Sequence, residues 1–122
     1  MIDPMTFARA WVDAWNRRDL EAVLAHYAED ASFLSPRAKA ATGNALVQGK
    51  PALRAYWSMA PVRFPDLHFT LDRALWDPAA RALTVLYVSR RSGTAQRAAE
   101  IMRFGNDGLI EFGEALYGAE VD

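Results

Sequence analysis

Residues 96–117 read QRAAEIMRFGNDGLIEFGEALY, and this stretch decides the fold. Residues 96–104 predict a strand, residues 106–108 (Asn-Asp-Gly) predict a hairpin turn, and residues 109–117 predict a returning strand. Side chains two positions apart in such a strand lie on the same face of the sheet. The C-terminal part of the chain is therefore predicted to be an antiparallel β-hairpin.

The residues before this hairpin continue the β pattern. Apolar side chains occupy every second position over residues 67–71, and residues 83–88 (LTVLYV) are rich in β-branched and aromatic types. Asp-Pro at residues 77–78 and Ser-Gly at residues 92–93 are typical turn sequences. We therefore predict four consecutive antiparallel strands in the second half of the chain.

The N-terminal half has helical periodicity instead. Aromatic side chains recur at every fourth position within residues 4–17, which predicts an amphipathic helix. Asp19 is expected to cap a second helix whose apolar stripe extends to Tyr27. Residues 49–59 predict a third helix, which Pro61 is expected to end.

Between the second and third helices, residues 31–35 predict a brief strand that stops at Pro36, and residues 36–49 predict a loop. Helices therefore come first along the chain and most strands come after them. This order predicts an α+β fold in which the helices are segregated on one face of a curved antiparallel sheet.

The composition is that of one globular domain spanning residues 1–122. With 14 Lys+Arg against 15 Asp+Glu, the net charge of -1 argues against nucleic acid or acidic membranes as general partners. The absence of cysteine excludes thiolate chemistry, and two histidines, His26 and His68, are too few and too far apart for a His-rich metal site. We find no cofactor motif, membrane span or signal-peptide pattern, so we expect a cytoplasmic protein without metal or cofactor.

Several motifs together resemble the nuclear transport factor 2-like superfamily, and within it the SnoaL-like and ketosteroid-isomerase-like branch. The matching segments are Trp15–Leu20, Tyr27–Pro36, Gly49–Trp57, Glu100–Phe104 and Asp107–Ile110. The resemblance implies a cone-shaped curved sheet with three N-terminal helices packed on its concave face, which is a cystatin-like α+β roll. It also implies a mostly apolar pocket at one end and a homodimer.

Three positions correspond to the catalytic residues of the steroid isomerases in this family. Ser35 occupies the position of the aspartate base, and its hydroxyl cannot accept a proton as a carboxylate does. The position of the oxyanion-hole tyrosine is Trp11, whose indole can donate a hydrogen bond but is not an acid. The second oxyanion donor of these isomerases is an aspartic acid that its apolar surroundings keep protonated. The corresponding position in this sequence is Glu100. With one carboxyl group of the set present, steroid isomerisation by the usual mechanism is not expected.

These positions predict an aromatic pocket around a single carboxyl group. Glu100 is the candidate catalytic residue, because a lone carboxyl in an apolar cleft is a candidate general acid or base. The expected substrate-binding residues are aromatic side chains of the helices and neighbours of Glu100 on the sheet. They are Trp11, Trp15, Tyr27, Ser35, Trp57, Met102, Ala115 and Tyr117.

Structural interpretations of the same residues stay open at this stage. The tryptophans are equally consistent with an ordinary core. Glu100 could pair with Arg90 or Arg97 on a sheet surface, and the cluster of Arg90, Arg91 and Arg97 is typical of a solvated strand edge.

Three hypotheses for the function follow. The first is an enzyme that binds a small hydrophobic molecule and moves a proton with Glu100, as an isomerase, cyclase or dehydratase does. The second is a non-catalytic binding protein, and the third is a dimerisation module whose cavity has closed below the ~300 Å³ of typical ligand sites. A homodimer would cover Leu86, Phe112 and Leu116, which are predicted to lie on the outer face of the sheet.

Overall fold

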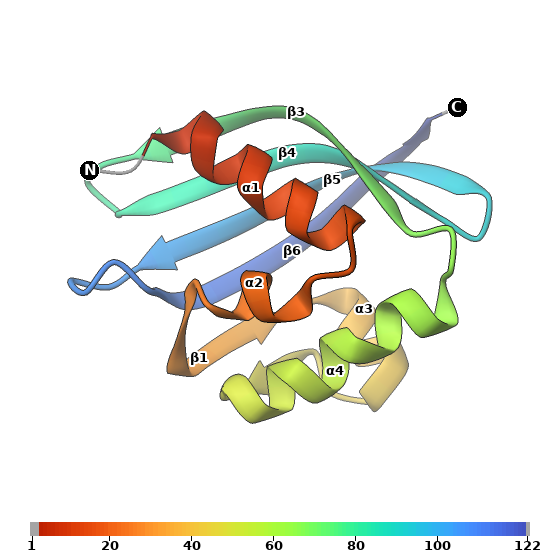
Figure 1. Ribbon diagram of the computed structural model, residues 1–122, viewed down its shortest axis with the longest axis horizontal. Helices are drawn as coiled ribbons and strands as arrows, with labels where there is room; N and C mark the ends of the chain where they lie inside the picture. The colour runs from red at the N-terminus through yellow and green to blue at the C-terminus, as the bar shows by residue number, and fades with distance from the viewer. Residues whose placement is uncertain (1–2, 122) are drawn as a thin grey trace.

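The computed structural model describes residues 3–121, in which six strands form one curved, unclosed sheet (Figure 1). The strands lie in the order β2-β1-β6-β5-β4-β3. Their bounds are β1 Tyr27–Leu34, β2 Leu46–Gln48, β3 His68–Asp77, β4 Ala82–Arg91, β5 Thr94–Phe104 and β6 Ile110–Val121. The predicted strands from β3 to β6 are thus confirmed. All neighbouring pairs are antiparallel except β1 and β6, which are parallel, so the sheet is mixed.

The helices lie on one side of this sheet, which confirms the predicted α+β class (Figure 1). Their bounds are α1 Pro4–Asn16, α2 Leu20–Leu24, α3 Pro36–Thr42 and α4 Lys50–Arg63. The predicted N-cap is confirmed, since the Asp19 side chain accepts a hydrogen bond of 3.1 Å from the Ala22 backbone N–H. None of these helices is long and apolar enough to cross a membrane.

The segment from Tyr27 to Gly49 differs from the prediction in two places. The second helix ends at Leu24, and Tyr27 begins β1 instead of closing that helix. The predicted loop contains α3 and β2. Helix α3 forms because the Ser35 side chain caps its first turn and Gly43, at φ 85°, ends it in the left-handed conformation that glycine adopts readily.

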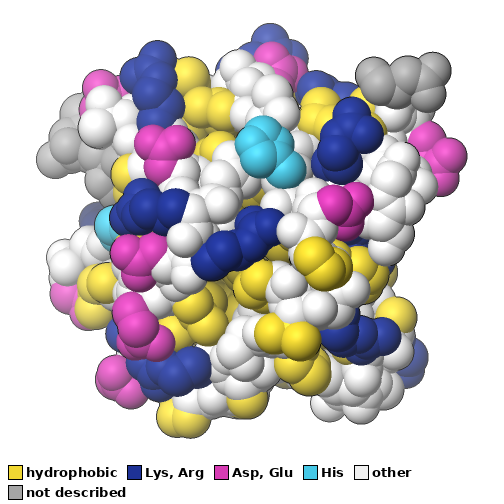
Figure 2. All heavy atoms as spheres, turned by 45° about the vertical axis from the view of Figure 1, so that its right-hand side comes forward, with side chains coloured by type: hydrophobic (Ala, Val, Ile, Leu, Met, Phe, Trp, Pro, Cys, Tyr) yellow, Lys and Arg dark blue, Asp and Glu magenta, His cyan; other side chains and the backbone are white. Residues whose placement is uncertain are grey.

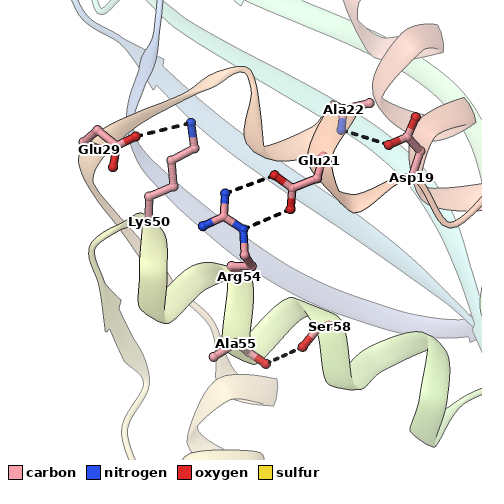
Figure 3. Close-up of polar contacts among 8 residues, drawn as sticks. All are labelled: Asp19, Glu21, Ala22, Glu29, Lys50, Arg54, Ala55 and Ser58. Atoms are coloured by element: carbon pink, nitrogen blue, oxygen red, sulfur yellow. Dashed lines mark hydrogen bonds and ion pairs between the residues drawn. The ribbon is translucent and has the colours of Figure 1, made fainter.

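Helix α4 continues through Pro61 to Arg63, beyond the predicted end. Proline removes one backbone donor from the helix, yet the helix extends two residues beyond it. Arg54 makes a bidentate ion pair with Glu21 of α2, at 2.9 and 3.0 Å, and Lys50 lies 3.8 Å from Glu29 of β1 (Figure 3). These pairs join α4 to α2 and β1 at the surface, and the buried side chains of Leu53 and Trp57 pack the helix into the core.

Helix α1 packs on β3 through aromatic side chains and one amide. The indole of Trp11 stacks on the Phe69 ring with centroids 5.4 Å apart. At the end of the helix, the Asn16 side chain donates to the Phe69 carbonyl and accepts from its backbone N–H, both at 2.8 Å. This two-sided bond fixes α1 against the inner face of the sheet.

Candidate functional site

A cavity of about 170 Å³ lies between α1, α3, α4 and the inner face of the sheet. Aromatic side chains form much of its wall, with Trp11, Trp15, Phe33, Trp57, Phe69 and Tyr87 in the lining. The cavity opens to solvent, and its exposed lining residues, Ala40, Ala41 and Arg63, mark the mouth. The inside of this site is therefore apolar and its opening lies beside α3 and the end of α4.

The aromatic wall is built from elements that are far apart in the sequence. Trp15 of α1 meets Trp57 of α4 edge-on, with ring centroids 5.8 Å apart, and Trp57 also meets Phe33 of β1 at 5.2 Å. Trp11 packs edge-on against Tyr87 of β4 at 5.3 Å. Edge-to-face contacts of this kind are favourable for aromatic rings, so these rings hold one another in place around the cavity.

Glu100 is the one carboxyl group on the cavity wall among the described residues. It lies on β5 opposite Val85 and Ala115, both of which are buried on the inner face of the sheet. Its side chain is 5% exposed, and this burial raises its pKa from 4.5 to about 8. Glu100 therefore carries its proton at neutral pH.

Two nearby groups lower the pKa of Glu100 by smaller amounts, first the Tyr27 hydroxyl and then the charge of Arg37. The Tyr27 hydroxyl nevertheless makes no hydrogen bond of standard geometry with the rest of the described chain. We therefore regard Tyr27 as a donor near Glu100 and not as a bonded partner. Burial raises the pKa of Tyr27 well above 10, so this hydroxyl keeps its proton.

Three buried polar atoms of this region have no hydrogen-bond partner within residues 3–121. They are the indole Nε1 atoms of Trp11 and Trp15 and the hydroxyl of Tyr27. Buried donors are usually paired, because an unpaired one loses its bond to water without replacement. Since both tryptophans line the cavity, their N–H groups are candidate donors to a bound molecule.

The mouth of the cavity is basic. Arg37 of α3, Arg63 of α4 and Arg91 of β4 all line the cavity, Arg63 is exposed, and the half-buried Arg37 and Arg91 also line an adjoining depression. On the face seen in Figure 2, Lys and Arg side chains lie scattered among hydrophobic and acidic ones, so this face has no broad basic patch.

The structure brings most of the predicted site residues to this cavity. Those that line it are Trp11, Trp15, Ser35, Trp57, Glu100 and Tyr117. Tyr27, Met102 and Ala115 are buried in the core and are not part of the lining. The alternative in which Glu100 pairs with a surface arginine is wrong, because Glu100 faces inward and Arg97 pairs with Asp72 at 2.8 Å.

Other lining residues were not predicted, and the arginines are the most informative of them. Arg91 was assigned to a solvated strand edge, but it is half-buried with its guanidinium carbon 4.2 Å from the centroid of the Phe64 ring. Arg37 fell in the predicted loop. Its capped helix was readable from Ser35-Pro36 and Gly43, whereas nothing in the sequence places Arg91 beside Arg37.

The chemistry available here is that of one protonated carboxyl group in an aromatic cavity. Among residues 3–121, no three His, Asp or Glu side chains lie close enough together to hold a metal ion. Ser35 does not supply a base, since its hydroxyl is buried and accepts the Arg37 backbone N–H at 3.1 Å. The volume is below the ~300 Å³ of typical ligand sites, which is the size limit that favours the third hypothesis, a dimerisation module with a closed cavity. The cavity nevertheless opens to solvent, and an engineered apolar cavity of about 150 Å³ is large enough to bind benzene. The site therefore suits a molecule of about one ring.

Comparison with known proteins identifies the family of the chain. The sequence model of the SnoaL-like domain matches residues 8–112. None of the curated proteins compared with the chain matches it. A SnoaL-like protein of unknown function from Burkholderia thailandensis is 33% identical, with a TM-score of 0.82 over 93% of this chain and 92% of that chain.

Two more distant structures share the fold. A hypothetical protein with a ketosteroid isomerase-like fold from Catenulispora acidiphila, solved in complex with trimethylamine, is 17% identical, with a TM-score of 0.69 over 90% of this chain and 83% of that chain. A computationally designed 17-OHP binder is also 17% identical, with a TM-score of 0.72 over 100% of this chain and 99% of that chain. The predicted superfamily is thus confirmed, and the chain belongs to the SnoaL-like family.

Proposed function

We propose that the protein binds a small hydrophobic molecule in the aromatic cavity and transfers a proton to or from it with Glu100. The observation that carries this proposal is the buried Glu100 carboxyl on the cavity wall, with its pKa raised to about 8. A carboxylic acid poised near neutral pH can both donate and accept a proton during turnover. The reaction class is a cofactor-independent isomerase, cyclase or dehydratase step.

The unpaired indole groups support the same proposal. In proton abstraction beside a carbonyl, negative charge develops on the carbonyl oxygen, and buried N–H donors stabilise that charge. Trp11 and Trp15 line the cavity, and the N–H group of each is buried without a partner in the described chain. A single carbonyl-bearing ring among these groups would therefore find a donor for its oxygen and a carboxyl group for its proton.

Exchange of α-hydrogens provides a test with a defined probe. Cyclohexanone in D2O exchanges its α-protons slowly, and the protein is expected to accelerate this exchange, as measured by proton NMR. The rate should rise as pH increases through about 8, because the ionised Glu100 carboxylate acts as the base that removes the proton. The removed proton enters solvent and a deuteron takes its place on the same carbon.

Glu100→Gln should abolish this acceleration while leaving binding intact, as followed by tryptophan fluorescence. The matched control is Glu114→Gln, which removes a carboxyl group from the outer face of the neighbouring strand. Equal exchange rates for the wild type and Glu100→Gln would remove Glu100 from the mechanism. Failure of cyclohexanone and other one-ring probes to bind would overturn the binding proposal as well.

A non-catalytic binding protein is the second candidate. It is favoured by the loss of acid–base groups at Ser35, whose hydroxyl caps α3, and at Trp11. Proteins of this fold include a designed 17-OHP binder and a complex with trimethylamine, so the fold accommodates small molecules of different kinds. This candidate predicts saturable binding of one-ring probes without any exchange above the uncatalysed rate.

We also propose that the protein is a homodimer. Leu86 and Leu116 lie on the outer face of the sheet, each opposite Ala99, and Leu116 is 47% exposed. A homodimer packed on this face would cover these apolar side chains. Sedimentation at micromolar concentration is expected to show a dimer that Leu116→Arg dissociates, and a monomeric wild type would refute this assignment.

A further inference from the structure

The three arginines at the cavity mouth have no acidic partner in the described part of the chain. The ion pairs of residues 3–121 involve four other cationic side chains. These are Arg17, Lys50, Arg54 and Arg97. A guanidinium group without a carboxylate partner remains able to bind an anion, and it does so with a planar set of donors that matches a carboxylate.

Neutral contacts hold two of these guanidinium groups in position. Arg37 donates to the Ser89 hydroxyl at 3.2 Å and to the Gln96 amide oxygen at 3.4 Å, and its Cζ lies 3.7 Å from the centroid of the Tyr117 ring. Arg91 lies over the Phe64 ring. These contacts fix the direction of the two arginine side chains without neutralising their charge. An anion that binds them therefore loses less free energy to the ordering of side chains.

The electrostatics of the mouth also favour an anion. Burial, followed by the positive charge of Arg37, lowers the pKa of Arg91, so the two cations repel each other. Glu100 is the one acidic side chain on the described lining, and it is protonated at neutral pH. The site therefore holds positive charge with no negative charge to balance it, and a bound anion would relieve the repulsion.

The position of these groups indicates how an anion would lie. Arg37, Phe64 and Arg91 line the cavity and also a second, more polar depression formed with Ser89, Ser92, Thr94 and Gln96. The guanidinium groups thus stand between an apolar interior and a polar exterior. This arrangement suits a molecule with an apolar ring at one end and a carboxylate at the other.

We infer that the ligand is a small organic monocarboxylate whose apolar ring enters the aromatic cavity while its carboxylate binds Arg37 and Arg91 at the mouth. This inference rests on the proposed function, because it specifies the ligand class of the same cavity. It adds selection for negative charge, which neither the aromatic wall nor Glu100 provides.

The test compares two probes of nearly equal shape, phenylacetate and its uncharged amide, phenylacetamide. Binding is measured by calorimetry and by the fluorescence of the cavity tryptophans. Charge-assisted hydrogen bonds contribute about 1.5–3 kcal/mol, which corresponds to roughly 10- to 100-fold in affinity. Phenylacetate is therefore expected to bind at least about tenfold more tightly than phenylacetamide.

Variants locate the charge that is responsible. Arg91→Gln is expected to weaken phenylacetate binding about tenfold and to leave phenylacetamide binding unchanged. Arg63→Gln, at an exposed side chain of the mouth whose replacement leaves the core intact, is expected to weaken phenylacetate binding in the same direction, and unchanged phenylacetate binding in both variants would overturn the inference. Arg97→Gln is the matched control, because it removes the same charge from a residue that pairs with Asp72 away from the cavity lining.

The possible outcomes separate this inference from the proposal on which it rests. Equal affinities for the two probes would overturn charge selection and leave binding in the aromatic cavity standing. An equal loss in Arg97→Gln and Arg91→Gln would also overturn it, since the effect would then be one of net charge. Binding of neither probe at millimolar concentration would overturn both proposals.

Discussion

The pH dependence of stability depends directly on the burial of Glu100. In the unfolded chain its carboxyl group ionises near pH 4.5, whereas the folded protein keeps the proton until about pH 8. Between these values the folded state binds more protons than the unfolded state, so the free energy of unfolding decreases as pH rises. Glu100→Gln places an uncharged side chain of similar shape at this position and removes that dependence.

The size of the effect follows from the two pKa values. One pKa unit corresponds to about 1.4 kcal/mol, so the interval from 4.5 to about 8 corresponds to about 5 kcal/mol in the free energy of unfolding. About 4 kcal/mol of this falls between pH 5 and pH 9. A domain is commonly stable by about 5–15 kcal/mol, so the change is a large fraction of the total.

Urea unfolding of the wild type and Glu100→Gln, measured from about pH 5 to about pH 9, tests this reasoning. The stability of Glu100→Gln relative to the wild type should increase up to about pH 8 and then level off, because other titrating groups cancel in the difference. Glu114→Gln on the outer face should show no comparable increase. A difference between wild type and Glu100→Gln that stays constant to within about 1 kcal/mol would show that Glu100 ionises normally in the folded protein.

Three further substitutions test the packing around the site, each by urea unfolding. Asn16→Ala removes both hydrogen bonds to Phe69 and should cost about 2 kcal/mol, and a loss under about 0.5 would refute the two-sided bond. Gly113→Ala would place a Cβ atom 3.1 Å from the Phe33 ring, which packs against Trp57. We therefore expect the free energy of unfolding to fall by about 1 kcal/mol. An unchanged or raised stability would show that the Phe33 ring moves aside without cost. Trp57→Ala should cost about 3–5 kcal/mol because the indole joins α4 to the core, and a cost below about 1 would contradict that role.

The strands and the first helix could be predicted because their periodicity is long. Strands β3 to β6 and α1 each present a repeated face to the core, and their bounds in the sequence and the structure differ by only a few residues. The shorter elements were harder to predict from the sequence. Tyr27 continues the helical spacing of α2, but it pairs with Ile110 of β6, and this long-range pairing cannot be read from local spacing.

The candidate site was predictable in its apolar part and not in its charged part. Trp11, Trp15 and Trp57 follow helical faces, and Glu100 follows strand alternation, so each could be assigned an inward direction. Arg37 and Arg91 come from α3 and the end of β4, and only the folded sheet brings them together. A single charged residue has no periodicity that would predict which neighbours it meets.

The place of β6 in the sheet has a consequence for how the chain folds. This strand is the last of the six to be synthesised, yet it is the only one that joins the β1–β2 pair to β3, β4 and β5. On the ribosome the β1–β2 pair therefore cannot join the rest of the sheet until β6 has emerged. Pairing between such distant segments slows folding and prolongs exposure to aggregation. The pairing of β6 with β1 is thus expected to be a late step in folding.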